Sequence, residues 1–226
     1  MIENKALNQA KRIGTGLSFV FFPLLFVFAF ATHPGLLNPR LLGPEELIFR
    51  AHQNSLLAFG HVLVTLSTAL LVVIALHFKK LLERSSVTWA AWAGLIGAVV
   101  AILGAVILAA DKGALCLSMS ALDTLPETEF AQMMPGLLAM FSFKGWLVLL
   151  WGILFLPIGF AIQAIALIKT RAFPRLGSIL FLIGALFVGF PDGAEIINLT
   201  ASILMAVALV PYGIQIIINK SQKATL

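Results

Sequence analysis

Long apolar stretches constrain this chain more than any other feature of its sequence. About 20 residues of α-helix cross the roughly 30 Å hydrocarbon core of a bilayer, and six stretches approach or exceed that length. Of the 226 residues, 60% are hydrophobic and 11% are charged, which is outside the usual range of soluble domains. The sequence therefore predicts an all-α, polytopic membrane protein with one transmembrane domain, a bundle of six helices. The predicted spans are 13–32, 55–78, 89–110, 146–168, 173–190 and 196–218.

Basic residues are concentrated in the connections on one side of this predicted bundle. Lys79, Lys80 and Arg84 follow the second span, and Lys169 and Arg171 separate the fourth span from the fifth. With six spans, both chain termini lie on the same basic side. Because cytoplasmic loops are enriched in lysine and arginine, we expect both termini to be cytoplasmic. We expect a multi-pass protein of the plasma (inner) membrane, typical of bacteria.

Two pairs of predicted spans resemble each other. The third and fifth spans each contain two glycines seven residues apart, while the fourth and sixth contain the related sequences PIGFAIQ and PYGIQ. This weak repeat allows a chain built from tandem helical hairpins, although glycine and proline are common in membrane helices in any case. The fifth span is also short and runs directly into the helix-breaking residues 191–193. It is either a continuous crossing or a broken helix.

The longest connection on the less basic side, residues 111–145, contains an amphipathic segment. Within residues 128–141 the apolar side chains recur at helical spacing. Such a segment either lies on the outer membrane surface as an interfacial helix or covers neighbouring helix ends. The apolar residues are Phe130, Met133, Met134, Leu137, Leu138 and Phe141.

Polar side chains in the outer half of the bundle form the candidate site. At about 100° per residue, Asn54, His61 and Thr65 fall in one sector of the second span, and Glu195 and Asn198 form a stripe at similar depth on the sixth. Ionisable groups within a span are costly and usually face a partner or a water-filled cavity. The predicted substrate-binding residues, including charged residues at neighbouring span ends, are His61, Asn54, Thr65, Glu195, Asn198, Asp111, Lys112, Lys144 and Asp192.

Three interpretations of these residues remain open. The first is binding or transport of a small solute, ion or lipid through the outer polar site. The second is an accessory subunit of a larger membrane complex or homo-oligomer, docking through Gly94, Gly97 and Gly104. The third is structural: His61 donates to a helix carbonyl, and Glu195 pairs with Lys112 or Lys144.

Cofactors and enzymatic activity are only weakly indicated. Copper would suit a soft-ligand set, but no ligand spacing supports it, and His52 and His61 lie on opposite sides of their helix. Haem bound by one histidine and a quinone in the phenylalanine-rich groove of the first span are further alternatives. No motif of a metalloprotease, serine hydrolase or phosphate-binding loop occurs. The basic residues interrupt apolar runs, which favours the lipid bilayer over nucleic acid as a partner. The candidate metal ligands are His33, His52, His61, Cys116, Met133 and Met134.

Overall fold

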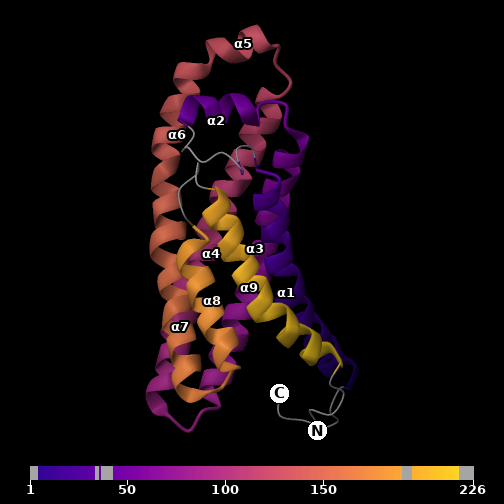
Figure 1. Ribbon diagram of the computed structural model, residues 1–226, viewed down its shortest axis with the longest axis vertical. Coiled ribbons are helices and arrows are strands. Elements are labelled where there is room, and N and C mark those ends of the chain that lie inside the picture. The colour runs from indigo at the N-terminus through magenta and orange to yellow at the C-terminus, as the bar shows by residue number, and fades with distance from the viewer. Residues whose placement is uncertain (1–4, 34–35, 37–42, 190–194, 219–226) are drawn as a thin grey trace.

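The computed structural model describes residues 5–33, 36, 43–189 and 195–218, with the side chains of 141–145 not included. Within these ranges the regular secondary structure is helical and contains no strand. The helices pack side by side as an elongated bundle (Figure 1). They are α1 (Lys5–Ala31), α2 (Pro44–Ala51), α3 (Ser55–Glu83), α4 (Thr88–Leu122), α5 (Glu127–Gln132), α6 (Met134–Val148), the π-helix η1 (Leu149–Phe155), α7 (Leu156–Thr170), α8 (Arg175–Phe187) and α9 (Glu195–Ile218).

Five helical segments are long and apolar enough to cross a membrane. They are α1, α3, α4, α9 and the continuous segment Trp146–Thr170, which joins the end of α6 to η1 and α7. The prediction of an all-α protein with several membrane-spanning helices is confirmed at this level. The predicted span 173–190 instead forms α8, whose 13 residues measure about 20 Å, less than the hydrocarbon thickness. The predicted break at 191–193 lies outside the described residues.

The predicted outer loop 111–145 is largely helical, which corrects the sequence analysis. α4 continues unbroken to Leu122 and α6 begins at Met134, so the two helices extend as a hairpin joined through α5 (Figure 1). The 35 residues of α4 measure about 52 Å, far more than a bilayer core requires. No proline interrupts 111–122, so nothing in this stretch forces the helix to end. We call residues 111–148 the outer hairpin, and the end of the bundle that carries α2 and α5 the outer end.

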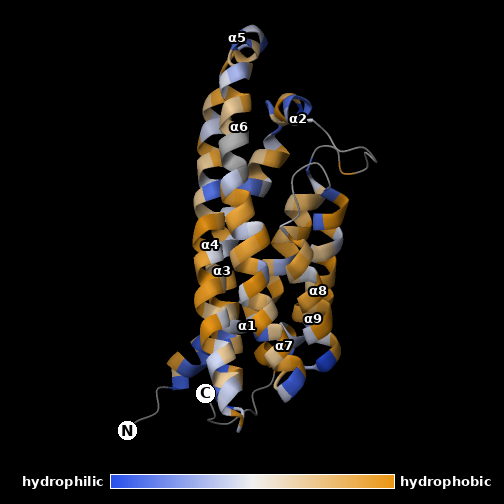
Figure 2. Ribbon diagram, turned by 90° about the vertical axis from the view of Figure 1, so that its left-hand side faces the viewer, coloured by the Kyte–Doolittle hydropathy of each residue, from blue (hydrophilic) through white to orange (hydrophobic). Residues whose placement is uncertain are grey.

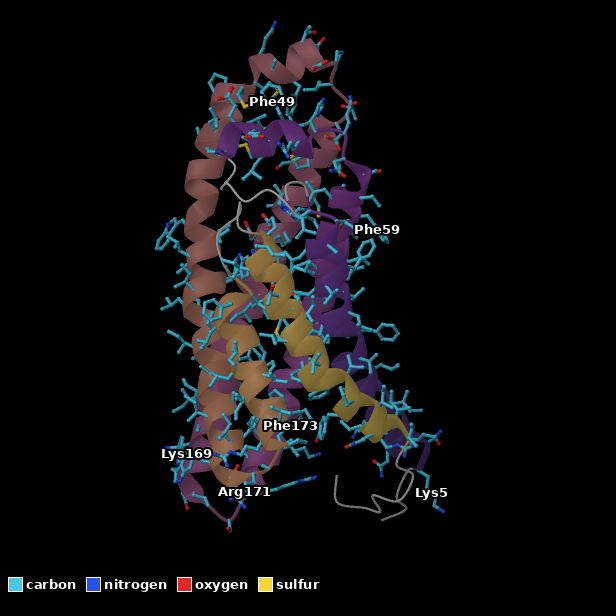
Figure 3. The ribbon with its side chains drawn as sticks, viewed as in Figure 1. Lys5, Phe49, Phe59, Lys169, Arg171 and Phe173 are labelled. Carbon is cyan, nitrogen blue, oxygen red and sulfur yellow. The ribbon has the colours of Figure 1, made fainter. Side chains whose placement is uncertain are left out.

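The buried side chains of the predicted amphipathic segment 128–141 pack on other helices, while Met133 is 46% exposed. Phe130, Met134 and Leu137 are buried in a cluster with Ile48 of α2 and Leu122 of α4. α2 lies across the outer end, where Figure 3 labels its Phe49. This packing is what the second alternative requires, and the interfacial position of the segment stays a prediction.

Close helix packing depends on glycine, as the contact between α4 and α7 shows most clearly. A methyl group on Gly159 of α7 would lie 2.3 Å from the backbone nitrogen of Ala101. One turn later, Nε2 of Gln163 donates to the carbonyl oxygens of Ala75 and Gly94, at 2.9 and 3.1 Å. α7 is thereby tied to both α3 and α4. The α4 glycines suggested as a docking face, Gly94, Gly97 and Gly104, are buried inside the bundle, which corrects that suggestion.

The repeated glycines of the weak sequence repeat have only partly equivalent contacts. Gly184 of α8 packs on α9, where a methyl group would lie 2.7 Å from the carbonyl oxygen of Ala201. This resembles the way Gly97 of α4 packs on α7. However, Gly159 of α7 faces α4, whereas the corresponding Gly213 of α9 faces Gly16 of α1. The shared glycines therefore support close packing in both halves without the same partners.

The charge asymmetry of the sequence appears as a difference between the two ends of the bundle. Lys5, Lys169 and Arg171 lie at the end opposite α2 (Figure 3). The helix shafts are mainly hydrophobic and the hydrophilic residues gather mainly towards the two ends (Figure 2). We call the end with these three residues the basic end.

Candidate functional site

His33 and Glu195 join the outer ends of α1 and α9. Nδ1 of His33 lies 3.1 Å from Oε1 of Glu195, and the side chains are 14% and 1% exposed. Glu195 is the first residue of α9, where the helix dipole favours a negative charge. The pair is therefore a carboxylate and an imidazole that are almost completely withdrawn from solvent.

His61 of α3 lies next to this pair. The rings of His33 and His61 have centroids 6.1 Å apart. Nδ1 of His61 lies 2.9 Å from the carbonyl oxygen of Leu57, and because a carbonyl can only accept, this nitrogen must carry the hydrogen. Nε2 is then an acceptor in the neutral ring and a donor in the protonated ring. The helix-carbonyl contact that the structural interpretation predicted is present, while Glu195 has His33 as a partner that the sequence analysis did not name.

A second group of polar side chains connects α4 to η1. Nε1 of Trp151 donates to Oδ2 of Asp111 at 3.2 Å, and Nζ of Lys112 lies 3.5 Å from the same oxygen. The ammonium is also 5.4 Å from the centroid of the Trp151 ring, within the range of a cation–π interaction. Asp111 and Lys112 are 1% and 8% exposed. A buried carboxylate and ammonium are tolerated here because each has a charged or polar partner.

The π-helix positions Trp151 in this group. A π turn accommodates one more residue than an α turn, and η1 ends two residues before Pro157. Proline lacks an N–H and its ring crowds the carbonyl four residues earlier, so the wider turn relieves that conflict. π segments are frequent at functional sites. The sequence analysis did not name Trp151. The sequence feature that could have pointed to it is a tryptophan shortly before a proline within one span.

The two groups meet around one small cavity. His33, His61, Lys112 and Trp151 line a space of about 30 Å³. A water molecule needs about 10–15 Å³ measured this way, so the cavity has room for one or two waters or a small ion rather than an organic solute. We call the following residues the polar network: His33, His61, Asp111, Lys112, Trp151 and Glu195.

Apolar side chains fill the bundle between the polar network and the basic end. Phe26, Leu71, Ile74, Met205 and Leu209 are each 3% exposed or less and belong to one continuous core. Ser67 and Ser202 also lie here, and their hydroxyls donate to carbonyls of their own helices. In this conformation the polar network is thus separated from the basic end by a packed apolar layer.

The structure brings together some of the predicted binding residues and separates others. His61, Glu195, Asp111 and Lys112 lie in the polar network, and Asn198 is buried one turn after Glu195. Thr65 donates to the carbonyl of His61 at 2.9 Å. Asn54 instead caps α3, because its Oδ1 accepts from the backbone nitrogen of Leu57 at 3.1 Å. Asp192 and the side chain of Lys144 lie outside the described residues.

The candidate metal ligands do not form a common site in the part of the chain that is described. No group of three or more His, Cys, Asp or Glu side chains that could hold a metal ion occurs there. His52 stacks on Phe130 with centroids 3.8 Å apart, and its Nδ1 lies 3.4 Å from Oδ1 of Asp123. His33 and His61 belong to the polar network. Cys116, Met133 and Met134 lie on the outer hairpin and its tip.

Comparisons with protein-family models, curated proteins and solved structures find no match for this chain. Function is therefore inferred from the geometry of the polar network and its surroundings. The charges of that network are the most informative property. Two carboxylates, one ammonium and two imidazoles form two adjoining groups. His33, His61 and Lys112 line the small cavity, while Glu195 and Asp111 contact residues of its wall.

Proposed function

We propose that the protein binds a small cation, entering from the outer end, in exchange for a proton held by the polar network. The observation that supports this is the charge composition of the polar network, in which Glu195 and Asp111 contact residues that line the 30 Å³ cavity. With both imidazoles neutral, the described members of the polar network hold two carboxylates, Asp111 and Glu195, and one ammonium, Lys112. Buried negative charge is expensive unless it is matched, so a network of this composition favours a proton or a small cation.

That positive charge has two alternative sources. A proton on His33 would lie directly beside Glu195, at the 3.1 Å contact. A small monovalent cation in the cavity would lie beside His33, the residue that contacts Glu195, and would reduce the benefit of the proton. Because either one balances the network, binding of the cation releases the proton. The apolar layer below makes the outer end the side from which both exchange, and transport to the other side would require that layer to open.

We expect ammonium or sodium chloride, added to the purified protein in weakly buffered detergent solution, to release up to about one proton per molecule. Glu195→Gln should abolish this release, because the neutral amide leaves Asp111 and Lys112 balanced. Glu46→Gln is the matched control, since Glu46 is an exposed carboxylate paired with Arg50. Choline serves as a size control because it exceeds the cavity. Absence of release from the native protein, or equal release from Glu195→Gln, would contradict the proposal.

We further propose that the bundle crosses the bacterial plasma membrane six times, with the predicted span that contains α8 as one of the crossings and both termini in the cytoplasm. The positions of Lys5, Lys169 and Arg171 at one end of the bundle support this orientation. In a Cys116→Ser background, Glu129→Cys on α5 should react with a membrane-impermeant thiol reagent in intact cells. Arg171→Cys should react only after permeabilisation. The opposite pattern would reverse the orientation.

The accessory-subunit interpretation expected an exposed face of small residues on α4. Gly94, Gly97 and Gly104 contact α3 and α7 within the same chain. They are therefore not accessible to a second protein. Ion binding at the polar network is the interpretation that the buried charges favour.

A further inference from the structure

A larger cavity lies between α4 and α6 in the outer hairpin. Its volume of about 430 Å³ falls within the range of ligand pockets, which is roughly 300–1,000 Å³. Most of the side chains that line it are apolar, a composition suited to a hydrocarbon chain. They include Ala114, Leu115 and Met119 of α4 and Leu137, Ala139 and Leu147 of α6.

Asp111 provides the polar end of this cavity. It is the one charged residue among the described lining residues. Its Oδ2 is occupied by Trp151 and Lys112, but its Oδ1 is buried and has no hydrogen-bond partner among the described residues. A buried oxygen of this kind is costly unless a donor reaches it. A ligand with a hydroxyl or amino group at one end of its chain would supply that donor after a small rotation of the carboxylate, because Oδ1 itself is closed to solvent in this conformation.

The position of the cavity along α4 restricts the kind of ligand further. Asp111 lies about 34 Å along α4 from Thr88, beyond the length that crosses the hydrocarbon core. From Asp111 the cavity continues outward to Leu122, which packs in the buried cluster with Ile48 and Phe130. Ala114 and Ala139 are exposed lining residues and mark the open side. A chain in the cavity would thus be sheltered above the bilayer core, beneath α2 and α5.

We propose that this cavity binds a single-chain amphiphile, with its hydrogen-bond-donating end on Asp111 and its hydrocarbon chain between α4 and α6. The occupant is one long chain ending in a hydroxyl or primary amine, because the cavity offers one apolar path and Asp111 is its charged acceptor, while the Ser118 hydroxyl already donates to the carbonyl of Ala114. A carboxylate at the chain end would be repelled by Asp111. Asp111 belongs to both proposals, but this one depends on the larger cavity and Oδ1, whereas cation exchange is tested at Glu195 and the histidines.

The test uses the full-length protein in detergent and a photoactivatable analogue of hexadecanol. Ultraviolet labelling should modify peptides of the outer hairpin, and unlabelled hexadecanol should compete about tenfold better than hexadecane, the value of one hydrogen bond to a charged acceptor. Palmitate should compete less well than hexadecanol. Asp111→Asn should reduce the preference for the alcohol severalfold, because bonds to neutral acceptors are weaker.

Two phenylalanine variants separate the cavity from nearby apolar surface. Ala114→Phe should fill the cavity and abolish labelling, whereas Ala110→Phe, at an exposed α4 position that does not line the cavity, should leave it unchanged. Both proteins are first compared with the native protein by helical circular dichroism and elution volume. Equal competition by hexadecane and hexadecanol, or displacement only by diacyl phospholipid, would overturn the proposal. A failed cation-exchange test would not affect this result, because the label contains no cation.

Discussion

Replacing Gly159 by alanine is expected to destabilise the protein by about 3 kcal/mol or more, at the upper end of the range for overpacking. The added methyl group would lie 2.3 Å from the backbone nitrogen of Ala101 and 2.8 Å from the carbonyl oxygen of Gly97. Because both are backbone atoms of α4, no side-chain rotation can make room. α7 would have to move away from α4 as a whole.

That movement would also break the bonds made by Gln163. Its amide reaches the carbonyls of Ala75 and Gly94 only while α7 remains close to α3 and α4. We expect the variant to lose monodisperse elution in detergent and to unfold at a much lower temperature. The matched control is Gly14→Ala, at a helical glycine with nothing within 4 Å of the new methyl group. It should be neutral or more stable by up to about 1 kcal/mol. Equal stability of the two variants would contradict the packing of α4 on α7.

Two substitutions at Glu195 are expected to separate stability from function. Glu195→Ala removes the partner of His33 and the favourable charge at the start of α9, which should cost about 1–3 kcal/mol. Glu195→Gln keeps a carbonyl oxygen that can accept from His33, so its stability should stay within about 1 kcal/mol of the native protein. Both variants remove the negative charge that favours a positive charge in the cavity. Both should therefore lose proton release completely.

The comparison is made by thermal unfolding and by proton release on the same preparations. Glu46→Ala provides the exposed control, because the pair Glu46–Arg50 lies on the surface and such pairs contribute about 0–1 kcal/mol. If Glu195→Gln unfolds like Glu195→Ala but still releases protons, the carboxylate is a structural group and the cation site lies elsewhere.

The sequence predicted the class of the fold because apolar length is decisive for membrane helices. It also predicted that His61 and Glu195 lie at similar depth. In the structure both lie close to His33, which follows α1 at the outer end. Helical periodicity alone could assign depth and face, but it could not identify the partner on a third helix. That partner depends on how α1 packs between α3 and α9.

The outer hairpin was mispredicted for a physical reason. Asp111 and Lys112 were interpreted as the end of a span, since charged residues usually mark the membrane surface. In the structure these charges interact with each other and with Trp151, so they stay buried while α4 continues. Trp151 lies 40 residues away in the sequence, and its position depends on the π-helix. Neither the long sequence separation nor the π-helix produces a periodic pattern in the sequence, so the contact between Asp111 and Trp151 could not be predicted.

The most direct test of the polar network is the protonation state of His33. NMR of protein with isotope-labelled histidine distinguishes the imidazolium ring from the neutral ring, and His33→Gln assigns the signal. We expect the addition of ammonium to change the protonation signal of His33 in the native protein and to leave it unchanged in Glu195→Gln. A His33 ring whose protonation responds neither to ammonium nor to Glu195→Gln would contradict the proposed exchange.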